Sequence, residues 1–133
     1  MQLDDRSQRF TRGHRLLKSA QFGRVFGNGI RTSDALFTVI GANTASPDQA
    51  EFSPCRLGLA ISRKAAPRAV DRNRIKRIIR ESFRLARHQW TDSSIDFVVI
   101  ARPPTARNQN PVLFRSLAHH WDRLCQDSRL ARL

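Results

Sequence analysis

The feature that most constrains this chain is the stretch DRNRIKRIIRESFRLARH, residues 71–88. It contains six arginines and one lysine among isoleucines and a phenylalanine, with only two acids. At about 100° per residue, the rotation of an α-helix, its apolar residues fall on one side and its cations on the other. The pattern predicts a two-sided helix from about Arg72 to Trp90, with one side packed against the rest of the protein.

The expected buried side is centred on Ile75 and covers roughly a third of the helix circumference. Its members are Ile75, Ile78, Ile79, Ser82, Leu85 and Ala86, with Phe83 at the edge. The opposite side gathers the cations Lys76, Arg77, Arg80, Arg84 and Arg87.

The cations of this helix are segregated rather than mixed with acids. Solvated helix faces usually mix charges, because opposite charges four residues apart stabilise a helix and like charges destabilise it. Lys76, Arg80 and Arg84 instead form a row of like charges, with only Glu81 nearby. Each like pair costs about 0.2–0.5 kcal/mol. This cost favours a surface that binds a polyanion over one that only faces solvent.

The beginning of the helix is suited to phosphate. The first turn of a helix has unpaired N–H groups and the positive end of the helix dipole. Asp71 is the expected N-cap, and Asn73 can both donate and accept a hydrogen bond, so it can contact a base or a ribose hydroxyl. Arg72 and Arg74 flank it with positive charge.

The charge of the whole chain points to the same kind of partner. The chain has 133 residues, which suits one domain, and 24 Lys and Arg against 11 acids give a net charge of +13. Self-repulsion at this charge opposes compactness, so a neutralising polyanion is expected. Nucleic acid is the first candidate and an anionic membrane surface the second.

Other features indicate a cytoplasmic protein with no membrane segment. No apolar run reaches the ~20 residues of a membrane helix. The charged N-terminus lacks the apolar region of a signal peptide. Cys55 and Cys125 have no paired spacing and are expected to be reduced thiols.

The remaining elements complete a single α+β domain over residues 1–133. A helix is expected within 16–29, with Ser19 as its cap and a left-handed glycine in the GNG at 27–29 as its end. Strands are expected at 35–43, 55–62 and 95–102, a further strand near 30–34, and a last helix at 112–126. Residues 1–13 are expected to form a loose arm and 127–133 a frayed tail. The prediction is a small, mostly antiparallel sheet of about four strands packed with three helices, in the order α-β-β(-β)-α-β-α.

The stretch AVDRNRIKRIIRESFR resembles the signature of the bacterial ribonuclease P protein subunit, an Arg-Asn-Arg motif followed by Ile-Lys-Arg. LGLAISRKAAPRAV is similar to the strand and connection that precede that helix in the family. LLKSAQFGRVFGNG resembles its first helix, and DFVVIARP its last strand. The resemblance runs from about Arg15 to Gln126 and implies a left-handed βαβ crossover, where general rules favour a right-handed one.

The resemblance also implies the function. Ribonuclease P is an endonuclease that removes the 5′ leader of precursor tRNA; in bacteria its RNA has the active site and the Mg²⁺ ions, and the protein binds that RNA and the leader. No catalytic or metal-ligating residue is then expected in this chain. The implied RNA-binding residues are Arg72, Asn73, Arg74, Lys76, Arg77 and Arg80, to which we add Arg63 and Lys64 from the preceding basic connection.

A cleft between the first helix and the sheet is implied for the leader, with Phe22, Phe26 and Phe37 as its aromatic residues. Where the family often has a further aromatic on the strand, this chain has Ile40, which removes a stacking contact worth roughly 1–3 kcal/mol per base. The alternative for Phe22 and Phe26 is core packing alone. Core positions are also expected for Trp90, Phe97, Phe114 and Trp121.

The residues themselves indicate no catalytic group. The histidines lack metal-ligand spacing, and the acids form no cluster in the sequence, although distant acids could converge in the fold. The expected partners are the catalytic RNA and precursor tRNA, with no membrane and no evident protein partner. Two other classes stay open on composition: a structural binder such as a ribosomal or nucleoid protein, and a metal nuclease that acts without RNA.

Overall fold

A computed structural model describes residues 19–43, 55–90 and 95–127 of the chain. Its elements are α2 (Ser19–Asn28), β1 (Ile30–Ser33), β2 (Phe37–Asn43), β3 (Arg56–Ala60), α3 (Ala69–Ala86), the 3-10 helix η2 (Arg87–Trp90), β4 (Ile95–Ala101), the 3-10 helix η3 (Pro103–Arg107) and α4 (Asn110–Cys125). The predicted order of helices and strands is confirmed, including the strand near Ile30. The expected arm at 1–13 and all but the first residue of the tail lie outside the described residues.

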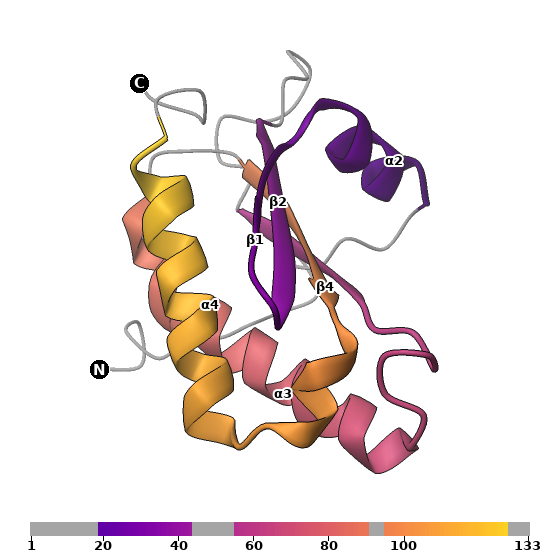
Figure 1. The fold of residues 1–133 in the computed structure, drawn as a ribbon. Helices are drawn as coiled ribbons and strands as arrows, with labels where there is room; N and C mark the ends of the chain where they lie inside the picture. Colours follow the sequence, from indigo (N-terminus) through magenta and orange to yellow (C-terminus); the bar gives the residue numbers. More distant parts are fainter. Residues whose placement is uncertain (1–18, 44–54, 91–94, 128–133) are drawn as a thin grey trace, which may run out of the picture.

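The four strands form one sheet in the order β1-β2-β4-β3. β2 pairs antiparallel with both β1 and β4, and only β3 and β4 pair in parallel, so the sheet is mostly antiparallel as predicted. α2 covers one face of the sheet, and α3 and α4 cover the other (Figure 1). The fold therefore has three layers, with the sheet in the middle.

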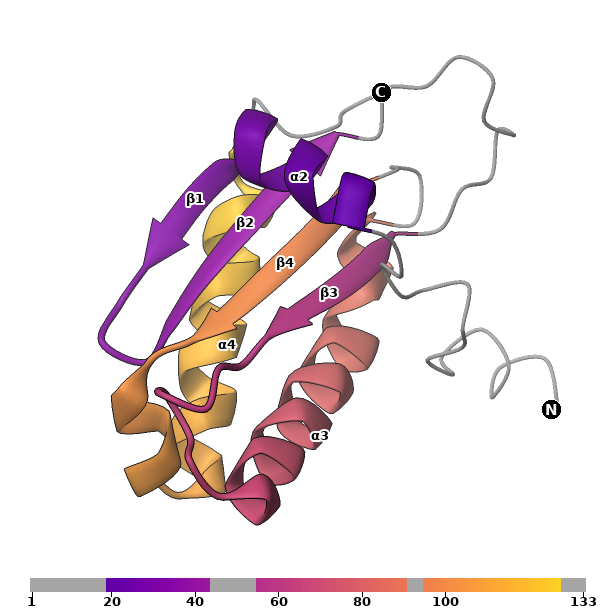
Figure 2. The ribbon, with the colours of Figure 1, turned by 90° about the vertical axis from the view of Figure 1, so that its right-hand side faces the viewer.

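The connection from β3 through α3 to β4 has an unusual hand. In Figure 2 both strands point down and to the left, β4 lies to the left of β3, and α3 lies behind the sheet. This arrangement makes the crossover left-handed, whereas such connections are right-handed in the great majority of proteins. The hand implied by the family resemblance is confirmed.

The main core lies between the sheet and the α3–α4 layer. Alternation along β2 and β4 directs Phe37, Val39 and Phe97 into this core and directs Ile40 and Val98 towards α2. Aromatic rings meet edge to face at its centre, in the pairs that Trp121 makes with Phe83, Trp90 and Phe97. Such pairs add about 0.5–1.5 kcal/mol beyond the area they bury.

Two predictions for α3 are wrong. The helix begins at Ala69, so its N-cap is Arg68, and Asp71 lies in the first turn, where its charge still complements the helix dipole. Leu85 is 54% exposed, although the helical wheel placed it on the buried side. The sheet and α4 cover a narrower stripe, which passes through Phe83 and Ala86 and leaves Leu85 outside.

The end of α2 also differs from the prediction. No described glycine has a positive φ, so no left-handed cap ends the helix. Gly29 is needed for another reason, because a Cβ there would overlap the Ile40 side chain and the Val25 carbonyl oxygen. Glycine at this position allows α2 to turn directly into β1 while lying close over β2.

Candidate nucleic-acid interface

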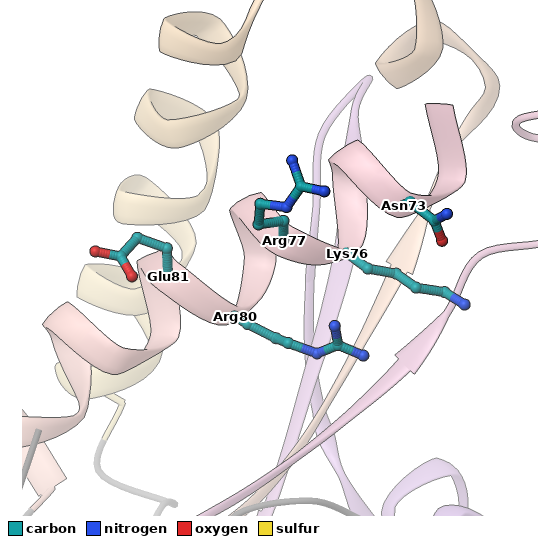
Figure 3. Close-up of a pocket in the computed structure, with 5 residues that line it drawn as sticks. All are labelled: Asn73, Lys76, Arg77, Arg80 and Glu81. Atoms are coloured by element: carbon teal, nitrogen blue, oxygen red, sulfur yellow. The ribbon is translucent and has the colours of Figure 1, made fainter. Parts of the chain in front are cut away.

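The outward side of α3 contains a cationic surface. Lys76, Arg77 and Arg80, with Asn73 and Glu81, line an open depression of about 350 Å³ (Figure 3). Asn73, Lys76 and Arg80 point to the same side of the helix, and Arg77 and Glu81 point away from them (Figure 3). The structure thus brings four of the eight predicted RNA-binding residues together, and we call Asn73, Lys76, Arg77 and Arg80 the α3 surface.

The acid beside the α3 surface does not neutralise it. Arg84 donates from Nε to Oε1 of Glu81 at 3.0 Å and from its terminal nitrogen to Oε2 at 2.6 Å. These hydrogen bonds hold the pKa of Glu81 below its ordinary value. Among the described residues, Lys76 and Arg77 form no ion pair. The predicted row is therefore divided: Arg84 is paired with Glu81, whereas Lys76 at the other end of the row forms no ion pair among the described residues.

The two arginines of the Arg-Asn-Arg motif point elsewhere. One terminal nitrogen of Arg72 donates to the carbonyl oxygens of Ala66 at 2.9 Å and Pro67 at 2.8 Å, in the turn before the helix. Arg74 donates to acceptors between 105 and 110, after β4. Only Asn73 of the motif is exposed. Whether either arginine also contacts RNA stays a prediction.

Arg63 and Lys64 lie in the turn between β3 and α3, and both are exposed. Ser62 holds this turn, because its Oγ accepts from the Ala65 N–H at 3.1 Å and its carbonyl from the Ala66 N–H at 3.0 Å. The turn leads directly into the first turn of α3. These two cations are thus positioned to extend the α3 surface.

The predicted leader cleft is rearranged. Phe26 on α2 is 43% exposed, and Phe22 is half-buried against the small cluster under α2. Phe37 is fully buried in the core on the opposite face of the sheet, so its prediction as a cleft residue is wrong. Its strand position sends it towards α4, since side chains alternate along a strand. Ile40 faces α2 but is only 1% exposed, because α2 covers it.

Residues that the sequence reasoning did not select occupy the α2 side of the sheet. Thr38 alternates with Phe37 and shares a hydrogen bond of 2.9 Å with the Ser33 hydroxyl. Arg56 and Asp96 face each other on β3 and β4 and form a two-pronged ion pair at 2.9 and 2.8 Å. Side chains alternate between the two faces of a sheet along each strand. If the face of one residue in each strand is known, this alternation assigns Thr38, Arg56 and Asp96 to the α2 side.

A partly buried polar network ties the β1–β2 hairpin to α4. Asp34 accepts hydrogen bonds from Ser116 Oγ at 2.6 Å and from the N–H groups of Leu36 and Phe37, both at 2.8 Å. Burial alone would raise the pKa of Asp34, but these hydrogen bonds outweigh it and lower the pKa to about 2. Nε2 of the fully buried His120 lies 3.2 Å from Asp34 Oδ2, and burial lowers the pKa of His120 despite this carboxylate.

The described residues contain no group of three or more His, Cys, Asp or Glu side chains that could hold a metal ion. Cys55 and Cys125 are free thiols, as predicted, and burial raises the pKa of Cys55 to about 11. In the part of the chain that the structure describes, no helix combines the length and apolar character needed to cross a membrane.

Comparisons with known proteins agree on one family. The family model described as Ribonuclease P matches residues 10–125. The ribonuclease P protein component of Methylococcus capsulatus is 46% identical over 112 residues, covering 84% of this chain and 81% of the relative. That of Nitrosococcus oceani is 42% identical over 122 residues, covering 90% of this chain and 96% of the relative.

Solved structures show the same similarity. The RNase P protein of Staphylococcus aureus superimposes with a TM-score of 0.71 at 31% identity, covering 85% of this chain and 95% of that one. The RNase P protein of Thermotoga maritima gives a TM-score of 0.66 at 26% identity, with 82% and 96% covered.

Proposed function

The chain belongs to the ribonuclease P protein family and is the protein subunit of that tRNA-processing endonuclease, and we propose that two of its surfaces divide the binding of RNA. The α3 surface, extended by Arg63 and Lys64, binds the catalytic RNA. The α2 side of the sheet holds the 5′ leader of precursor tRNA.

The observation that carries this proposal is the segregation of charge on α3. Lys76 and Arg77 face solvent without an acid partner among the described residues, while the neighbouring Glu81 is engaged by Arg84. Arginine presents a planar fork that matches two phosphate oxygens. Binding a phosphate releases condensed counterions, which supplies affinity without any base contact. The surface is thus suited to an RNA backbone.

The α2 side suits a single strand better than a duplex. Phe26 offers an exposed ring for a base, and Phe22 lies one helical turn before it. Because Phe37 and Ile40 are buried, Phe22 and Phe26 are the rings that the described part of this side offers to the leader. Thr38 lies on the same side of the sheet, and its hydroxyl offers a hydrogen-bonding group.

The cleavage chemistry is assigned to the catalytic RNA and the Mg²⁺ ions that this RNA binds. Charge and positioning are the contributions that the cationic α3 surface offers. Neutralising phosphates reduces the repulsion between RNA segments that Mg²⁺ would otherwise have to screen, so a lower concentration of the ion is sufficient. This work is proposed to take place in the cytoplasm, with precursor tRNA as the substrate.

The test is cleavage of precursor tRNA by the catalytic RNA at low Mg²⁺, with and without the protein. We expect the protein to lower the Mg²⁺ requirement or the KM, and the triple variant Lys76→Ala, Arg77→Ala, Arg80→Ala to lose most of this effect. The control replaces two exposed cations of α4, Arg115 and Arg123, by alanine, and it is compared with the double variant Lys76→Ala, Arg77→Ala, which removes the same charge. Equal losses in the two sets would show that net charge, and not the α3 surface, is responsible.

Two outcomes would favour the other classes. Purification from cells with ribosomal RNA or DNA as the dominant nucleic acid would support a structural binder. Cleavage by RNA-free protein, abolished by a single carboxylate variant, would support a metal nuclease.

A further inference from the structure

We propose that Arg74 is a positioning residue: its guanidinium fixes the connection between β4 and α4 against α3 and does not serve as a ligand of RNA phosphate. The inference rests on the proposed function, because its readout is binding of the catalytic RNA. It assigns Arg74 and Arg77, which lie three residues apart in the basic stretch, to different tasks.

The geometry of Arg74 carries the proposal. One terminal nitrogen donates to the Asn110 Oδ1 at 2.8 Å and to the Asn108 carbonyl at 3.2 Å. The other reaches the carbonyl oxygens of Ala106 at 3.3 Å and Thr105 at 3.5 Å. The two terminal nitrogens are therefore directed at protein acceptors, 31 to 36 residues away in the sequence.

These acceptors lie at the end of η3 and the beginning of α4. Thr105 and Ala106 belong to the last turn of η3, where the Asn108 N–H caps the Thr105 carbonyl at 3.2 Å and Arg74 supplies a donor to the Ala106 carbonyl. Asn110 is the first residue of α4. Arg74 thus closes the end of η3 and holds the beginning of α4 at the same point on α3.

The first residue of the connection is held separately, because Arg102 donates from its backbone N–H to the Leu36 carbonyl at 2.9 Å and from a terminal nitrogen to the Asp34 carbonyl at 2.8 Å. Further along, Thr105 is fully buried and its hydroxyl bonds locally, to the Arg102 carbonyl at 2.7 Å. Asn108 likewise bonds within the segment, to the Pro104 carbonyl at 2.8 Å. Packing of an apolar side chain cannot replace Arg74 here, because the segment offers only the half-buried Ala106 to the main core.

Fixing this connection matters for RNA because the connection bears the exposed Arg107. The position of Arg107 relative to Lys76 and Arg77 depends on the contact that Arg74 makes. If the connection between β4 and α4 is not held in place, the beginning of α3 also loses its contact with this segment. Loss of the Arg74 fork should therefore lower RNA affinity without removing a phosphate contact.

The experiment compares lysine and glutamine at positions 74 and 77, with affinity for the catalytic RNA measured over a range of salt concentrations. Lysine keeps the charge but not the planar fork of arginine. It can therefore bind a phosphate but cannot bridge four fixed acceptors. We expect Arg74→Lys and Arg74→Gln to lose affinity equally, by about threefold to tenfold, with the wild-type salt slope. At position 77 the lysine variant should bind several-fold more tightly than the glutamine variant, and Arg77→Gln should lower the slope by about 0.7–0.9.

Two further measurements separate positioning from a loss of folding. Hydrogen exchange should quicken at Asn108, Val112 and Leu113 in both Arg74 variants and stay unchanged in Arg77→Gln, since those amides bond within the held segment. The milder Asn110→Ala removes one acceptor, so it should lower RNA affinity slightly in the wild type and not at all in the Arg74→Gln background.

Retained affinity in Arg74→Lys, with a lower salt slope in Arg74→Gln, would overturn the proposal and make Arg74 a phosphate ligand. Unchanged affinity in all Arg74 variants would overturn it too. Failure of the proposed function would look different, because Arg77→Gln would then change neither the affinity nor the slope.

Discussion

The α3 surface and the α2 side of the sheet differ in whether their cations are paired with acids. On α3, Lys76 and Arg77 face solvent without an acid partner in the described structure. On the α2 side, the charges of Arg56 and Asp96 cancel within one largely buried ion pair, and the cluster under α2 is apolar. Unpaired cations attract a polyanion over a long range, whereas an exposed ring such as Phe26 contacts a base at short range. One small domain thus offers two kinds of contact with RNA.

The largest effect is expected from breaking the Arg56–Asp96 ion pair on the α2 side. The Asp96 side chain is 2% exposed, and Asp96→Ala leaves Arg56 largely buried without its partner. Breaking such a pair costs about 3–5 kcal/mol of unfolding free energy, measurable by urea denaturation. The salt slope of RNA binding should not change.

The control for this variant is Asp122→Ala, which removes an exposed acid from α4. Its effect should stay within about 0.5 kcal/mol. Similar stabilities for the two variants would contradict a structural role of the buried pair.

The next largest effect is expected from the exposed ring of Phe26. Phe26→Ala should weaken binding of precursor tRNA by the value of one stacked base, about 1–3 kcal/mol, and leave binding of leaderless tRNA unchanged. Affinities of the assembled enzyme for the two substrates measure this. Phe37→Leu serves as the control, because that ring lies in the core on the other face and should not alter the ratio. A larger change in ratio for Phe37→Leu would restore the cleft that the sequence suggested.

Single alanine variants of the α3 surface should each have a moderate effect. Lys76→Ala, Arg77→Ala and Arg80→Ala remove about one phosphate contact each, so each should flatten the salt dependence of binding to the catalytic RNA by about 0.7–0.9 units. The slope of log affinity against log salt concentration measures this. If all three slopes match the wild type, α3 does not face RNA and the contrast with the α2 side disappears.

The smallest effect at neutral pH should come from His120 on α4, which lies against Thr32 and Asp34 of the β1–β2 hairpin. Burial lowers the pKa of His120 from 6.5. Below about pH 6.5 the unfolded chain therefore binds a proton at this residue that the native protein does not bind. Unfolding free energy should therefore fall as the pH drops from about 6.5, and His120→Gln should flatten this decline. Denaturation at a series of pH values measures it, and an unchanged decline in the variant would assign it to other groups.

Asp34 should produce a second fall in the unfolding free energy, at lower pH. Its pKa is lowered from 3.8 to about 2, so its contribution to stability is complete above the unfolded value and is lost between about pH 4 and pH 2.

The sequence predicted most of the fold because its patterns are local. The alternation of IDFVVIA and the helical spacing of VLFRSLAHHW placed β4 and α4 to within about two residues, and boundaries are usually no sharper. Where a prediction was wrong, a distant contact decided the outcome. Leu85 is exposed because the packing neighbours of α3 end beside it, and Gly29 is required by Ile40 on a neighbouring strand.

By itself the sequence determined the segregation of cations on one helix and hence the class of partner, because helical spacing fixes which side chains share a side. The tertiary structure decided the task of each residue. It placed Phe37 in the core, joined Arg74 to acceptors more than thirty positions away, and left Arg77 in solvent. The physical reason is that a hydrogen bond or a buried ring depends on neighbours that the chain brings together only on folding, and no local pattern encodes them.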